Sequence, residues 1–220
     1  MGADVRLGSV ALIAGLLALS LAGAAAIVAM RSAERQPPGP VAITLGSERL
    51  TMLSGYLRPD SRQGGAMDTL EMAALFPDFS PAGETVDVNA RTDLSERFAR
   101  MVFVTVKPSD ASLDPADLPA KLYERFLDPT SWSHPGGLVA RAFVDGSPFE
   151  GDELYFVEPD GREFAARCRR PDSRRKTPNT CMYEFRLRDL DVEMRFSAGL
   201  LAEWTSLKAN ARGLIESALR

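Results

Sequence analysis

The sequence predicts an α+β protein. We expect one N-terminal transmembrane helix, then a mixed domain with a C-terminal antiparallel β-meander packed by an amphipathic helix. An uncharged run of 24 residues near the start, alternating apolar segments in the last third and a final helical apolar stripe support this prediction. The predicted organisation is a tail at 1–6, an anchor at 7–30, a proline-rich linker at 31–40 and a domain at 41–220.

The run 7–30 is long enough to cross a membrane. As a helix it extends roughly 36 Å, whereas the hydrocarbon core of a bilayer is about 30 Å thick. Ala22-Gly23-Ala24 and Ala24-Ala25-Ala26 resemble signal-peptidase sites, but the apolar run continues to Met30 and is longer than a signal-peptide core. The sequence therefore favours an uncleaved anchor over a cleaved signal peptide or a buried helix of a soluble protein.

The orientation of the anchor follows from its position more than from its flanking charges. The charges on the two sides are nearly balanced, so the positive-inside rule gives little guidance. A short tail before the span and a long domain after it are typical of a signal anchor. We therefore expect a single-pass protein of the cell inner membrane with its C-terminal domain in the periplasm.

A stripe of small residues within the anchor permits homodimerisation. The stripe recurs every four residues, and such a face lets a second helix approach closely. The general abundance of alanine in this chain is the alternative explanation. The residues of the stripe are Ala14, Ala18, Ala22 and Ala26.

Composition and single residues argue against several functions. The net charge of −4 is unlike that of a nucleic-acid-binding protein. His134 is the only histidine, which excludes a zinc site with several histidines, and no GxSxG motif is present to supply a nucleophile. Asp110, Asp114 and Asp117 lack the glycine and final glutamate of an EF-hand, so helix capping is the favoured role. We expect no catalytic residue, metal or cofactor.

Hydrophobic periodicity predicts the elements of the domain. The C-terminal helix most simply covers the open sheet face, and a coiled-coil contact with a partner is the alternative. The segment 128–137, with Trp132 and His134, is expected to be a loop. Strands are predicted at 41–45, 48–57, 86–88, 101–106, 138–144, 154–157, 163–168, 181–187 and 192–196, and helical segments at 67–75, 93–96, 118–127 and 200–218.

Cys168 and Cys181 are predicted to form a disulfide. They lie at the facing ends of two predicted neighbouring strands, where Cα atoms come within bonding range. Two buried thiols or a redox pair are the alternatives, and the latter lacks the usual CxxC spacing. A structural disulfide requires an oxidising compartment, which agrees with export through the run 7–30.

The loop between the cysteines is strongly basic in an otherwise acidic protein. Asp172 is the only acidic residue among ten positions that carry six cations. This pattern predicts contact with an anionic partner, either an envelope protein or an anionic lipid or glycan. A solvated hairpin tip is the alternative. The cations are Arg167, Arg169, Arg170, Arg174, Arg175 and Lys176.

These observations favour a membrane-anchored, non-enzymatic envelope protein with an accessory or scaffold role. A secreted or anchored periplasmic ligand-binding module is the second hypothesis. An envelope enzyme is the third and least favoured, because no catalytic motif is present.

Overall fold

In a computed structural model of the protein, residues 39–83, 96–110, 113–170 and 179–219 are described. The anchor, its alanine stripe, the linker up to residue 38, the strand expected at 86–88 and nearly all of the helical turn at 93–96 lie outside these residues. No helix within the described residues is long and apolar enough to cross a membrane. The fold below concerns the unit that begins at Pro40.

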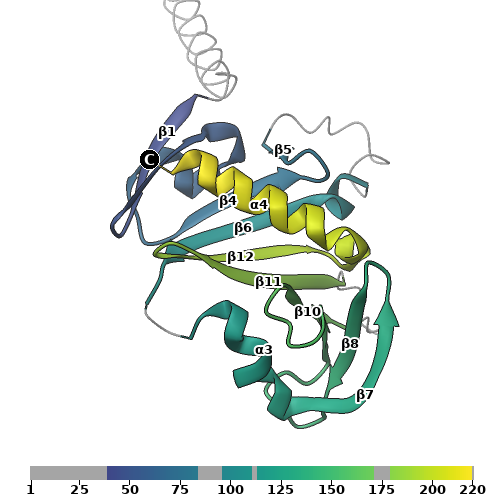
Figure 1. The fold of residues 1–220 in the computed structure, drawn as a ribbon. Helices are drawn as coiled ribbons and strands as arrows, with labels where there is room; N and C mark the ends of the chain where they lie inside the picture. The colour runs from purple at the N-terminus through teal and green to yellow at the C-terminus, as the bar shows by residue number, and fades with distance from the viewer. Residues whose placement is uncertain (1–38, 84–95, 111–112, 171–178, 220) are drawn as a thin grey trace, which may run out of the picture. The chain divides into compact units, whose positions relative to one another are not determined.

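A nine-stranded antiparallel sheet organises this unit (Figure 1). Its strand order is β5-β4-β6-β12-β11-β10-β9-β8-β7, so the last six strands of the chain form a continuous meander. The predicted C-terminal antiparallel meander is confirmed as part of this larger one. The strands are β4 (Leu70–Leu75), β5 (Ser80–Pro81), β6 (Met101–Pro108), β7 (Leu127–His134), β8 (Leu138–Phe143), β9 (Asp152–Phe156), β10 (Ala165–Arg169), β11 (Thr180–Leu187) and β12 (Leu190–Ser197).

A smaller sheet begins the unit. It has the order β2-β1-β3, and β1 pairs antiparallel with β2 through a tight turn at Gly46, whose φ of 57° suits glycine. Two 3₁₀ turns, η1 and η2, lie between β2 and β3. The bounds are β1 (Pro40–Leu45), β2 (Glu48–Leu53), η1 (Ser54–Tyr56), η2 (Pro59–Gln63) and β3 (Gly65–Ala66).

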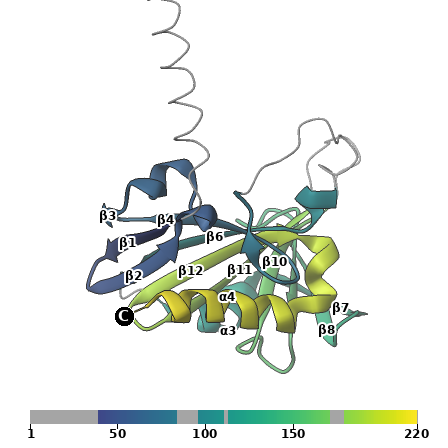
Figure 2. The same ribbon diagram turned by 90° about the horizontal axis from the view of Figure 1, so that it is seen from above.

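The C-terminal helix covers one face of the large sheet, as predicted. A 3₁₀ turn, η5 (Ala198–Glu203), leads into α4 (Trp204–Ala218). Figures 1 and 2 show α4 lying over β4, β6 and β12. Leu207, Ala211 and Ile215 are fully buried at four-residue spacing and pack with the strands in the main core cluster.

A second core cluster lies against the strands at the other end of the sheet. It joins Tyr123 to Phe143, Leu154 and Phe156, and edge-to-face rings strengthen the contact between Tyr123 and Phe143. The Asp114 side chain caps this helical segment by accepting a hydrogen bond from the Ala116 backbone N–H, at 2.9 Å. The segment consists of η3 (Pro115–Asp117), α3 (Leu118–Lys121) and η4 (Tyr123–Phe126), shorter and less regular than the helix expected at 118–127.

Two predicted elements are wrong. The helix expected at 67–75 is instead strand β4, because Leu70, Met72 and Ala74 alternate into the core and pair with β6. The loop expected at 128–137 is mostly strand β7, which pairs with β8 up to His134. In both segments long-range pairing overrides local preference, since Leu, Met and Ala favour helices and a run of polar residues favours loops.

Candidate functional site

Cys168 and Cys181 form the predicted disulfide. They face each other directly in the register of β10 and β11, with Cα atoms 4.0 Å apart. Both residues are buried, and they tie together the two strands that lead into the segment 171–178. The bond therefore closes a loop whose ends are fixed in the centre of the meander.

Asp152 organises the basic residues beside this disulfide. Its buried carboxylate accepts a hydrogen bond from Arg167 Nη1 at 2.9 Å, and Arg169 Nε lies 3.0 Å from its other oxygen. The Arg167 side chain is only 25% exposed, and its guanidinium lies over the Phe149 ring at 5.2 Å from the centroid. Two of the six predicted contact residues are thus bound to one carboxylate.

Of the other four cations, only Arg170 lies within the described residues. Arg170 continues the strand end, and its backbone N–H donates to the Gly151 carbonyl at 2.9 Å. Arg174, Arg175 and Lys176 lie outside the described residues. Contact of the basic residues with an anionic partner stays a prediction.

Glu184 lies on β11, close enough to Arg167 for their charges to interact. Burial raises the pKa of its carboxyl, and the carboxylate of Glu193, directly opposite on β12, raises the pKa further. Arg167 and Lys107 act in the opposite direction by stabilising the charged form. The carboxyl of Glu184 therefore stays protonated to higher pH than an exposed glutamate.

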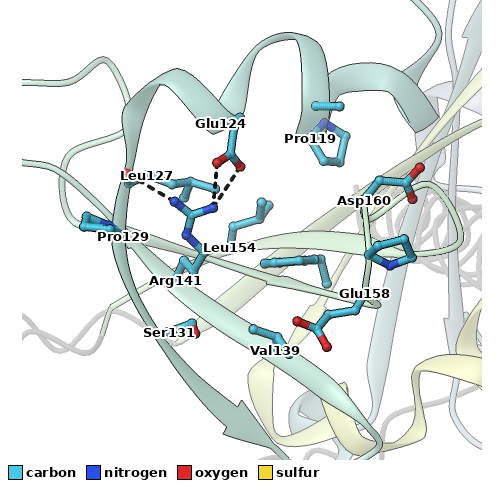
Figure 3. Close-up of a pocket in the computed structure, with 13 residues that line it drawn as sticks. Pro119, Glu124, Leu127, Pro129, Ser131, Val139, Arg141, Leu154, Glu158 and Asp160 are labelled. Carbon is cyan, nitrogen blue, oxygen red and sulfur yellow. Dashed lines mark hydrogen bonds and ion pairs between the residues drawn. The ribbon is translucent and has the colours of Figure 1, made fainter.

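A groove of about 550 Å³ lies between the helical segment 115–126 and strands β7 to β9 (Figure 3). Val139, Leu154 and Phe156 form its apolar floor, and Leu154 and Phe156 belong to the second core cluster. Glu158 and Asp160, from the exposed turn between β9 and β10, line the same groove. This combination of an apolar floor and carboxylates at the margin suits an amphipathic side chain.

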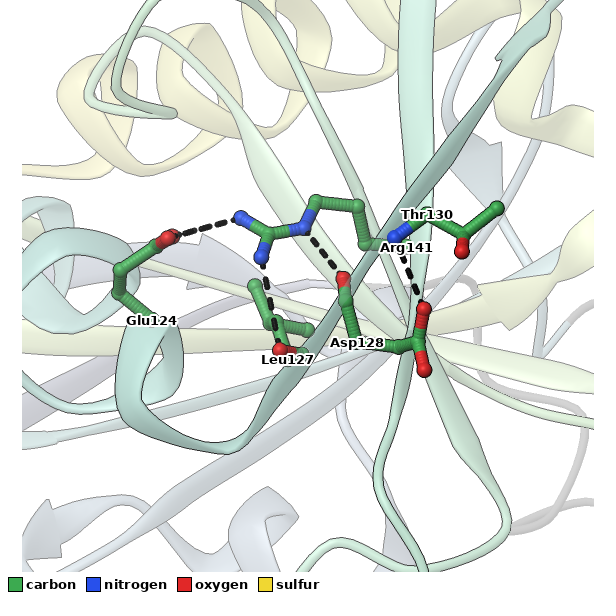
Figure 4. Close-up of polar contacts among 5 residues, drawn as sticks. All are labelled: Glu124, Leu127, Asp128, Thr130 and Arg141. Carbon is green, nitrogen blue, oxygen red and sulfur yellow. Dashed lines mark hydrogen bonds and ion pairs between the residues drawn. The ribbon is translucent and has the colours of Figure 1, made fainter.

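Arg141 on β8 holds one wall of the groove in place (Figure 4). Its guanidinium donates to both carboxylate oxygens of Glu124, at 2.8 and 2.9 Å, and to the backbone carbonyls of Asp128 and Leu127, at 2.8 and 3.5 Å. Thr130 N–H donates to the Asp128 carboxylate at 2.8 Å, which fixes the start of β7. The positive charge of Arg141 is thus paired with the Glu124 carboxylate in the same wall of the groove.

Strand β7 forms the outer edge of the sheet beside this groove. Every residue from Pro129 to Ser133 is exposed, and the exposed fraction of Trp132 is 40%. On the face away from the groove, the ring of His134 contacts Tyr155 edge-to-face, with centroids 5.0 Å apart. The Nδ1 atom of His134 lies 2.9 Å from the Pro135 carbonyl oxygen, so the structure gives this histidine local contacts.

Sequence reasoning missed the groove because its residues come from four separate segments. Arg141 was the one available signal, as a charged residue in the middle of an apolar strand. No group of three or more His, Cys, Asp or Glu side chains with metal-binding geometry occurs within the described residues.

The fold and the disulfide define a class: a disulfide-closed α+β domain built on an antiparallel sheet with a C-terminal helix. The chain matches no protein-family model and no curated protein sequence. Two solved structures share its fold. One is Smlt3025, an immunity protein of the Stenotrophomonas maltophilia type IV secretion system, with a TM-score of 0.58, 17% identity, and coverage of 84% of this chain and 94% of that one. The other is the Neisseria meningitidis iron-regulated outer membrane lipoprotein FrpD, with a TM-score of 0.50, 10% identity, and coverage of 84% and 96%.

Proposed function

We propose that this chain is a membrane-anchored, non-enzymatic envelope protein whose domain lies in the periplasm and binds a protein partner. The observation that carries the proposal is the Cys168–Cys181 bond, because structural disulfides persist in oxidising compartments. In this proposal the run 7–30 is the anchor in the inner membrane, and the proline-rich linker 31–40 separates it from the domain.

One of the two proteins that share the fold supports a binding role. One is an immunity protein of a secretion system and the other an outer membrane lipoprotein. The immunity proteins of the colicin DNases act by binding and form some of the tightest protein complexes known. We infer that this chain likewise acts through one protein partner in the envelope, in an accessory or scaffold role.

The basic residues at 167–176 are the proposed contact surface for an acidic patch on that partner. The single charge of Asp152 offsets part of the positive charge of Arg167 and Arg169, so the proposal gives the largest electrostatic role to the four cations from Arg170 to Lys176. A loop closed by a disulfide loses less conformational freedom on binding than an open one, which favours affinity. The charge also favours rapid association at low ionic strength.

Photo-crosslinking in cells tests the proposal. A benzophenone amino acid is placed at position 174 of the full-length protein, and at the exposed position 203 as the matched control. We expect a discrete protein adduct at 174 that is absent at 203 and is lost when Arg170, Arg175 and Lys176 are changed to Glu. Absence of any adduct specific to 174 would contradict the proposal, and flotation of the protein on phosphatidylglycerol vesicles would then assign the surface to anionic lipid.

A further inference from the structure

The groove beside β7 differs from the basic residues in the sign of its charge. The register places it at the other end of the β9–β10 hairpin from the disulfide: Cys168 pairs with Glu153, whereas Ala165 pairs with Phe156 just before the turn at 158–160. The groove therefore stands apart from the surface used in the proposed function. An inference about it holds or fails independently.

The charges of the groove select a cation. Three carboxylates line it, from Glu124, Glu158 and Asp160, against the single guanidinium of Arg141. Glu124 already pairs with Arg141 at 2.8 Å, so Glu158 and Asp160 remain as net negative charge. Within the described residues Glu158 has no ion-pair partner, and Asp160 accepts only a backbone hydrogen bond, from Arg162 N–H at 3.1 Å.

The floor of the groove selects an aliphatic stem. Leu154 and Phe156 are buried at its base and Val139 is half-buried beside them. Lysine and arginine cover apolar surface with their methylene groups while they keep the charged head in a polar environment. A side chain of this kind meets the apolar floor and the carboxylates together, which a small inorganic cation does not.

The edge of the sheet formed by β7 indicates how a partner could place such a side chain in the groove. Ser131 pairs with Arg141, which pairs with Leu154, so these residues share the face of the sheet that carries the groove. Within the described residues β7 pairs only with β8, so no other described strand occupies its outer edge. From Ser131 to His134 its pairing with β8 is regular, which leaves a straight edge for an added strand.

We propose that an extended segment of a partner protein adds to the outer edge of β7 and places one lysine or arginine side chain in the groove. Main-chain pairing along β7 contributes affinity. Glu158 and Asp160 select the cation, and Arg141, through Glu124, Leu127 and Asp128, positions the wall that faces it. Partners without a basic residue at that point are discriminated against by the unneutralised carboxylates.

A synthetic strand serves as the probe for the full-length protein in mild detergent. The peptide is capped at both ends and alternates threonine and valine around one central arginine. Trp132 is exposed on β7, so its fluorescence is expected to change when the peptide binds along this strand. Trp204 is buried, so its fluorescence is expected to change little. We expect saturable binding that weakens as the ionic strength rises, because the charges are partly exposed.

Matched variants and probes separate the two parts of the proposal. Replacing Glu158 and Asp160 by Gln and Asn is expected to weaken binding about tenfold, whereas the exposed control Glu203→Gln leaves it unchanged. A probe with glutamate in place of arginine, or with N-methyl groups along its backbone, is expected not to bind. All three substituted residues are exposed, so we expect the variants to fold as the original protein does. Circular dichroism checks this.

Three outcomes would overturn the proposal. The first is no binding of the arginine peptide at millimolar concentration. The second is equal binding of free N-acetyl-arginine amide, which would make the groove a site for a small cation without strand addition. The third is self-association of the full chain that is abolished by the Glu158 and Asp160 variants, which would assign the groove to a second copy.

Discussion

Replacement of Asp152 by Asn tests how the basic residues are held at the disulfide. Asp152 is 5% exposed, accepts one hydrogen bond from Arg167 and lies 3.0 Å from Arg169 Nε. The isosteric amide keeps the shape and removes the charge, so the half-buried guanidinium of Arg167 loses its principal counter-ion. The change in the free energy of unfolding therefore measures how much the charge of Asp152 contributes to stability.

The expected cost is about 2–3 kcal/mol in the free energy of unfolding. Breaking a fully buried ion pair costs about 3–5 kcal/mol. The smaller figure applies here because Arg167 retains 25% exposure and Arg169 57%, and because Glu184 lies close enough to Arg167 to compensate in part. With a urea m-value of about 2 kcal/mol/M, the midpoint falls by about 1–1.5 M.

Equilibrium urea unfolding at neutral pH, followed by circular dichroism, makes the measurement. Arg169→Gln is the matched control, with an expected cost below about 1 kcal/mol because its pair is largely exposed. In a double-mutant cycle, Arg167→Met is expected to recover part of the loss in Asp152→Asn. A cost below about 0.5 kcal/mol for Asp152→Asn, or an equal cost for Arg169→Gln, would refute the reasoning.

Three further predictions concern the disulfide, the half-buried carboxyl of Glu184 and helix α4. Reduction of Cys168–Cys181 is expected to lower the free energy of unfolding by about 3 kcal/mol, from a loop of 13 residues. Urea unfolding with and without reductant measures this, and the double alanine variant is expected to be insensitive to reductant. Because burial raises the folded-state pKa of Glu184, the folded state binds more protons than the unfolded state between the two pKa values, and stability falls as pH rises through that window. Glu184→Gln is therefore expected to raise the melting temperature above this window and to remove this contribution to its decline within the window; an unchanged pH profile would contradict this. Ile215→Ala is expected to cost about 3 kcal/mol, since Ile215 is fully buried between α4 and the large sheet, whereas the exposed Ser217→Ala costs less than about 0.5 kcal/mol by the same unfolding assay.

Local pattern was sufficient to predict elements whose burial repeats at short range. Val192, Met194 and Phe196 alternate with charged residues, and the structure places them in β12 with the apolar set buried. The disulfide followed from the same reasoning, because strand ends joined by a hairpin meet in register. The apolar stripe of α4 was also sufficient to predict that helix, since its apolar residues all pack into the main core cluster.

Elements that depend on distant partners were harder to predict. The segment 67–75 has helix-favouring residues, and only its pairing with β6 makes it a strand. The polar segment 128–134 buries little surface of its own and is a strand because β8 offers it an edge. Pairing between strands carries the information that local preference lacks.

The candidate sites show the same division. The basic residues are contiguous in sequence and could be identified by counting charges, but Asp152, which binds two of them, lies fifteen positions before Arg167. The groove combines Glu124, Arg141 and Glu158 from three different segments. Sequence reveals a site when its residues are neighbours, and the fold is needed when they are not.

The central claim is that the domain is anchored and faces an oxidising compartment. Its most direct test is intact mass spectrometry of the protein from the membrane fraction, with thiols alkylated before and after reduction. The account predicts the full-length mass, with Cys168 and Cys181 alkylated only after reduction. Alkylation of both thiols without reduction would contradict it.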